Sequence, residues 1–152
     1  MLRKLLWAGL VAGGMLPVAS EAVATATATP TIEIPAGISV ELGRRDFRNY
    51  CAACHGVDAM GDGTIAEFLT INAPDLTRLA KRNAGNFPRE KILMVIDGRA
   101  EVKVHGARDM PVWGEWFNAE AGAPGGDAGL REQIVRERIE SLVNYIETLQ
   151  VK

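Results

Sequence analysis

Two cysteines and a histidine within five consecutive positions constrain this chain more than any other feature. They form the run Cys51-Ala52-Ala53-Cys54-His55, and the whole sequence holds only two cysteines and two histidines. Thiols three positions apart lie on one helical turn, where each can add to a vinyl group of a porphyrin, and the adjacent histidine then lies beneath the iron. The run predicts a covalent haem-attachment site, with Cys51 and Cys54 as thioether links and His55 as the proximal axial ligand.

Other uses of closely spaced cysteines fit this sequence less well. A thioredoxin-like dithiol needs a βαβ setting, and no strand-rich, alternating stretch surrounds the run. A structural zinc site needs four ligands, and the one further candidate is His105, fifty positions after His55. A disulfide across a two-residue spacer closes a small ring that is strained and easily reduced.

The first twenty residues have the three parts of a secretory signal peptide. A basic start (Arg3, Lys4) precedes an apolar run that reaches Leu16, and Pro17 and small residues follow. An uncleaved membrane anchor is the alternative, but the apolar run is short for a bilayer span and contains three glycines. We expect residues 1–20 to be removed on export to the periplasm, with no stable membrane insertion afterwards. Export agrees with covalent haem attachment, which takes place outside the cytoplasm.

Composition divides the remainder into a leader and one domain. Residues 21–38 are rich in Ala, Thr and Pro and predict a flexible tether, whereas residues 39–152 have the length of one small domain. So small a domain buries little apolar surface of its own, so we expect a haem to complete its core. Without residues 1–20 the chain has 15 basic and 19 acidic side chains, a net charge of −4, which argues against nucleic-acid binding.

Apolar periodicity predicts an all-α domain. The spacing favours helices over 41–50, which leads into Cys51, over 89–96, and over 130–150, where apolar residues recur every three or four positions. Glycine, proline and Asx residues predict loops over 56–77 and 122–129, the first of them wrapping the haem edge. No segment alternates with period two for long enough to predict a sheet.

The second axial ligand decides the chemistry, and four residues are candidates: His105, Met60, Met94 and Met110. Met94 lies within the apolar run 92–96 and is interpreted as a core residue, and Met60 follows Cys54 too closely to reach the far face of a porphyrin. Met110 is 55 residues after His55, where Pro111 stiffens the segment and Trp113 supplies an apolar wall. Met110 is the favoured second axial ligand, and the alternatives are His105 or a site left open.

The sequence resembles the bacterial class I (monohaem) cytochromes c over about residues 40–150. The matching segments are, in order, 51–56 (CAACHG), 73–76 (APDL), 110–113 (MPVW) and 142–146 (LVNYI). The resemblance implies a small all-α fold of helices and long loops around one covalent haem c. It implies that Pro74 accepts a hydrogen bond from the proximal histidine, and that Leu76 and Trp113 belong to the haem surroundings.

The resemblance also implies a contact between the first and last helices through Gly43, Phe47 and Tyr145. Trp116, Phe117 and the glycine-rich stretch that follows match the family less well. They suggest a local insertion that could shape a partner surface.

An iron with both axial positions filled by protein does not readily bind substrate, so we expect a one-electron carrier between redox proteins rather than an enzyme. The alternatives are a permanent cytochrome subunit of a dehydrogenase or oxidase complex and, less favoured, a gas-binding or peroxidase protein in which the sixth ligand dissociates. The sequence names neither the electron donor nor the acceptor.

Overall fold

The computed structural model describes residues 33–99, 110–122 and 126–151, all within one unit of the chain, Glu33–Lys152. The expected signal peptide, most of the expected leader and the candidate ligand His105 lie outside the described residues. The described residues form helices, turns and loops and contain no β-strand, which confirms the predicted all-α class. None of the helices in this part of the chain combines the length and apolarity needed to cross a bilayer.

The haem-attachment motif ends the first helical segment, as predicted. Helix α1 (Ala36–Asp46) continues into a π-helical turn, η1 (Phe47–Cys51), and then into α2 (Ala52–His55). The helix begins at Ala36, within the last residues of the expected leader. It ends at Gly56, whose φ of +81° is a left-handed conformation that glycine adopts without a Cβ clash.

The last helix, α6 (Ala128–Thr148), follows the predicted amphipathic pattern. Asp127 caps its N-terminus by accepting a 2.8 Å hydrogen bond from the Leu130 amide. The buried face includes Val135, Ile139, Leu142 and Ile146, which confirms the predicted stripe.

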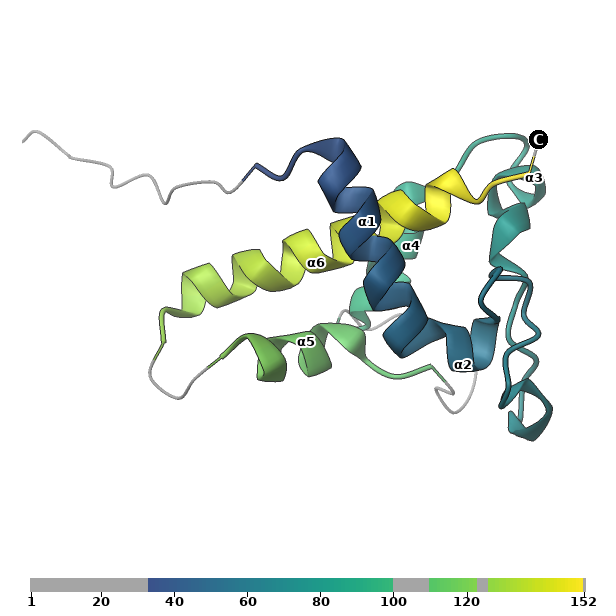
Figure 1. Cartoon of the computed structure of the whole chain (residues 1–152), viewed down its shortest axis with the longest axis horizontal. Helices are drawn as coiled ribbons and strands as arrows, with labels where there is room; N and C mark the ends of the chain where they lie inside the picture. The colour runs from purple at the N-terminus through teal and green to yellow at the C-terminus, as the bar shows by residue number, and fades with distance from the viewer. Residues whose placement is uncertain (1–32, 100–109, 123–125, 152) are drawn as a thin grey trace, which may run out of the picture. The chain divides into compact units, whose positions relative to one another are not determined.

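Helices α1 and α6 cross in close contact, and Figure 1 shows α1 lying across the middle of α6. A Cβ at Gly43 would overlap the backbone carbonyl of Ser141, so only glycine fits at the crossing. Next to it the Phe47 and Tyr145 rings pack with centroids 5.4 Å apart, and the Ser39 and Ser141 hydroxyls lie 3.1 Å apart. The expected contact through Gly43, Phe47 and Tyr145 is confirmed.

Two of the remaining helices cover the other faces of α6. Helix α4 (Arg89–Asp97) follows Pro88 and ends at Gly98 (φ +63°), close to the predicted bounds. Helix α5 (Trp113–Ala121) was not predicted, because Trp116 and Phe117 were assigned to a local insertion. Phe117 does not shape a partner surface, as was suggested, because it is 1% exposed and belongs to the core, whereas Trp116 is 55% exposed.

Met94 is not a core residue, contrary to the prediction. Its side chain is 50% exposed, whereas Ile96 on the same helix is buried. Five consecutive apolar residues span more than one helical turn, so they cannot all face the core, and Met94 lies on the face opposite Ile92 and Ile96.

The predicted loop 56–77 contains one short helical turn and runs into two more at its C-terminal end. These are η2 (Ala66–Phe68), η3 (Leu76–Arg78) and α3 (Leu79–Arg82). The loop packs directly on the motif, because Gly61 and Gly63 donate backbone hydrogen bonds to the carbonyls of His55 (2.7 Å) and Cys54 (3.2 Å).

We predict that Gly43→Ala lowers the free energy of unfolding by about 1–3 kcal/mol, because the added methyl group must push α1 away from α6. Urea unfolding of the haem-loaded protein measures this. The matched control is Gly37→Ala on the same helix, where a Cβ meets nothing within 4 Å, and which we expect to be neutral or slightly stabilising. Equal effects of the two substitutions would contradict the close crossing.

Candidate functional site

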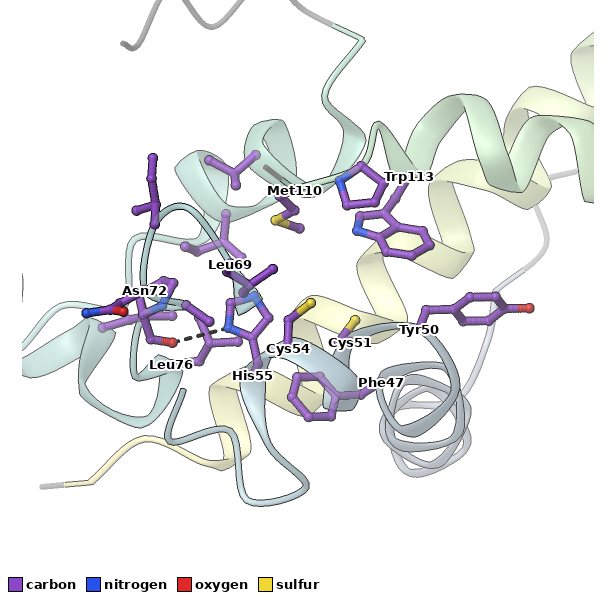
Figure 2. Close-up of a pocket in the computed structure, with 17 residues that line it drawn as sticks. Phe47, Tyr50, Cys51, Cys54, His55, Leu69, Asn72, Leu76, Met110 and Trp113 are labelled. Carbon is purple, nitrogen blue, oxygen red and sulfur yellow. Dashed lines mark hydrogen bonds between the residues drawn. The ribbon is translucent and has the colours of Figure 1, made fainter. Parts of the chain in front are cut away.

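An apolar cavity of about 380 Å³ lies where four separate segments of the chain meet. Figure 2 shows the motif on one side of this cavity and Met110 and Trp113 on the other. The loop residues 69–76 and helix α4 supply the remaining walls. The volume falls within the range of about 300–1,000 Å³ that is usual for cofactor sites.

The two thiols of the motif face this cavity from the same helical turn. Both cysteines are unpaired, and Figure 2 shows their sulfur atoms on the cavity side of the helix. Burial, followed by the nearby charges of Asp46 and Cys54, raises the pKa of Cys51 to about 12. The reactive cysteines of redox dithiols have lowered pKa values, so the raised pKa of Cys51 does not favour the thioredoxin-like alternative.

His55 is held in one orientation by the loop that passes beside it. Its Nδ1 donates to the carbonyl oxygen of Pro74 over 3.2 Å, drawn as a dashed line in Figure 2. This leaves Nε2 directed toward the cavity as an available donor atom. Burial lowers the pKa of His55, and the contact with Pro74 opposes this only in part. The ring is therefore neutral near pH 7, the form that binds a metal.

The Pro74 carbonyl is itself held by its neighbours. The Asp75 carboxylate accepts hydrogen bonds from the Thr77 amide (2.8 Å) and hydroxyl (2.6 Å) and so caps η3. The Leu76 amide donates to the Ala59 carbonyl over 2.8 Å, and the Leu76 side chain lines the cavity. A Cβ at Gly61 (φ +87°) would overlap the Ala73 carbonyl, which shows how tightly the loop is folded.

Met110 lies across the cavity from His55. It is partly buried and lines the wall formed with Pro111 and Trp113, and Figure 2 shows its thioether on the side opposite the histidine ring. Met60 is 60% exposed and Met94 is 50% exposed, and neither lines this cavity. His105 lies outside the described residues.

Sequence reasoning missed the support behind the Trp113 wall. Trp113 stacks on Phe117, with ring centroids 5.9 Å apart, and Tyr50 packs edge-on against both rings. The guanidinium of Arg138 lies 4.0 Å above the centroid of Phe117.

The same guanidinium joins three helices. Arg138 on α6 pairs with Asp46 on α1 (Nε to Oδ2, 2.6 Å) and with Glu120 on α5 (Nη1 to Oε2, 2.6 Å). Glu120 also accepts hydrogen bonds from Tyr50 and from Trp116. Nothing in the local sequence distinguishes Arg138 from a solvated helix residue, since its partners are 18 and 92 positions away.

The residues around the cavity fit a covalently bound haem. The cavity brings together two thiols, a neutral imidazole and a thioether within apolar walls, the set of groups that attaches and ligates haem iron. Among residues 33–99, 110–122 and 126–151, no group of three or more His, Cys, Asp or Glu side chains could hold a metal ion by itself. The fold and the cavity thus define an all-α haem protein.

Comparison with known proteins gives the family. The cytochrome c family model matches residues 40–150, so the chain belongs to the cytochrome c family. Membership implies a covalently attached haem c and an electron-carrier role. Neither a search of curated proteins nor a search of solved structures returned a match.

We predict that Asp75→Ala lowers the free energy of unfolding by about 1 kcal/mol at pH 7, because η3 loses its cap. The hydrogen bond from Thr77 holds the pKa of Asp75 below its ordinary value. The stabilisation is therefore fully present above the ordinary pKa of about 3.9, and it is lost as the pH falls through the lowered value.

The difference between wild type and variant should accordingly shrink as urea unfolding is repeated at successively lower pH below about 4. Asp58→Ala, which removes an exposed carboxylate of the same loop, is the control and should change little at any pH. If the difference in unfolding free energy between wild type and Asp75→Ala grew toward low pH, Asp75 would not stabilise η3 as its ionised cap.

Proposed function

We propose that this chain is a class I, monohaem cytochrome c, exported to a bacterial periplasm, which carries single electrons between redox proteins. The observation that supports this best is the placement of His55 and Met110 on opposite walls of one apolar cavity that also contains both motif cysteines. A single Cys-x-x-Cys-His run in the sequence argues for one haem. The basic and apolar start of the chain supports export.

In this proposal each group has a separate task. Cys51 and Cys54 would hold the haem through thioether links, and His55 and Met110 would ligate its iron. Pro74, Leu76 and Trp113 form part of the surroundings. When bound, haem supplies an iron that alternates between the ferrous and ferric states and so transfers one electron.

The protein groups tune that electron transfer. The Pro74 carbonyl fixes the ring orientation of His55 and makes it a better donor. The Met110 thioether is a weak donor that favours ferrous over ferric iron, and the apolar walls disfavour the additional positive charge of the ferric state. Both effects raise the reduction potential. Ligation by both side chains would keep small molecules from the metal.

We predict that intact-mass analysis under denaturing conditions, on protein exported by cells with haem-attachment machinery, gives the chain without its first 20 or 22 residues plus one haem. Cys51→Ala should retain at most one thioether link. A mature chain without covalent haem would overturn the proposal, and a full-length chain found only in the membrane fraction would identify residues 1–20 as an anchor.

We predict that Met110→Ala opens the iron to carbon monoxide and lowers the reduction potential by a sizeable part of the roughly 0.8 V that axial ligation spans. His105→Ala is the matched comparison and should leave both properties unchanged. Carbon monoxide difference spectra and redox titration measure the two effects. If His105→Ala abolished low-spin ferric iron while Met110→Ala changed nothing, the protein would be a bis-histidine cytochrome of lower potential.

A further inference from the structure

The loop beside the haem-attachment motif exposes large apolar side chains that no core position requires. Phe68, the last residue of η2, is 77% exposed, and Ile65, the residue before η2, is 42% exposed. They are one turn apart, since the Phe68 amide donates to the Ile65 carbonyl over 3.0 Å. Val57 and Met60, earlier in the same loop, are 65% and 60% exposed. Exposed apolar side chains that lie together mark interaction surfaces, whereas single scattered ones do not, and Ile65 and Phe68 are the pair that one helical turn brings together.

This segment is fixed against the motif. The Ile65 amide donates to the Ala53 carbonyl over 3.0 Å, and a Cβ at Gly63 would overlap that same carbonyl. Ala53 lies between the two cysteines, and Leu69, the residue after η2, lines the cavity. Ile65 is therefore hydrogen-bonded to the backbone of the motif, and Phe68 is directly followed by a residue of the cavity wall.

The charges of this loop have one sign. Residues 56–77 contain four acidic residues, Asp58, Asp62, Glu67 and Asp75, and no lysine or arginine. Asp75 caps η3 and pairs with Arg78, whereas the other three carboxylates are exposed. The basic residues that follow belong to η3 and α3. Two of them, Arg78 and Arg82, contact Asp75 at the C-terminal end of the loop.

We infer that Ile65 and Phe68, with the exposed carboxylates Asp58, Asp62 and Glu67, form a docking surface, here called the η2 patch. The partner that fits is a redox protein whose contact face has an apolar centre and a rim of lysine and arginine side chains. This inference rests on the proposed electron-carrier function and adds the site and the charge of the partner. A second copy of this chain does not fit, because its η2 patch would bring the same acidic charges into contact.

The charge of the η2 patch is tested without electron transfer. Hexaamminechromium(III), a redox-inert paramagnetic trication, is added to ¹⁵N-labelled, reduced holoprotein, and the broadening of amide signals is measured. The amides of residues 58–68 should broaden first, and Glu67→Lys should reduce their broadening severalfold. Glu33→Lys, at a position before α1, makes the same change in net charge and should leave the broadening of these amides unchanged. Broadening centred elsewhere overturns the inference, and because this readout needs no partner, it is independent of the carrier proposal.

The docking role is tested by stopped-flow electron transfer with a lysine-rich, basic cytochrome c as the probe. At low salt, Glu67→Lys should slow the second-order rate about three- to tenfold and Glu33→Lys much less, because local charge steers the encounter. Phe68→Ala should slow the rate at both low and high salt, since apolar contact is not screened. Its rate with a small neutral mediator, its visible spectrum and its reduction potential should match wild type.

Two results would overturn the docking role. Equal slowing by Glu67→Lys and Glu33→Lys would show that net charge alone governs the encounter, and an unchanged rate for Phe68→Ala would show that η2 is not part of the contact. A wild-type protein that lacks haem, or that fails to exchange electrons even with the neutral mediator, would instead be a failure of the proposed function.

Discussion

The close crossing of α1 and α6 at Gly43 is the contact from which the site is built. Because the helix backbones meet without a side chain between them, the direction of α1 is set within narrow limits, and α1 continues through η1 and α2 to His55 without a break. The position of the motif is therefore set by a helix contact eight residues before it. The Phe47–Tyr145 pair, immediately beside the crossing, also places Phe47 in the cavity wall.

The two sides of the cavity are stabilised in different ways. On the His55 side, backbone hydrogen bonds within residues 53–76 hold the loop and aim the Pro74 carbonyl at the ring. On the Met110 side, aromatic stacking and the Arg138 pairs hold Trp113 and α5 against α1 and α6. Burial opposes the charge of Arg138, but hydrogen bonds to Asp46 and Glu120 outweigh it and raise the pKa of this arginine. This guanidinium therefore stays charged and paired at any physiological pH.

An electron carrier needs a rigid, dry metal site and a way for partners to approach it. The apolar walls and the anchored imidazole serve the first need, since fixed ligands and excluded water keep reorganisation small. In the docking inference, the exposed, acidic loop around η2 is where the partner approaches. This loop lies against the motif, since the Ile65 amide donates to the Ala53 carbonyl. The same loop therefore holds His55 from inside and, in the docking inference, offers a contact surface outside.

The sequence by itself determined the features that depend on local spacing. The motif placed two thiols and an imidazole on one turn, the periodicity of 130–150 predicted α6, and glycine and proline marked the loops, because each of these follows from neighbours within a few positions. Only the tertiary structure decided which apolar side chains are buried. Phe117 enters the core and Met94 does not, because burial depends on which helix face meets a neighbour, and that neighbour is supplied by distant segments. The pairing of Arg138 with Asp46 across 92 positions is decided in the same way, since no local pattern relates residues that meet only after the chain has folded.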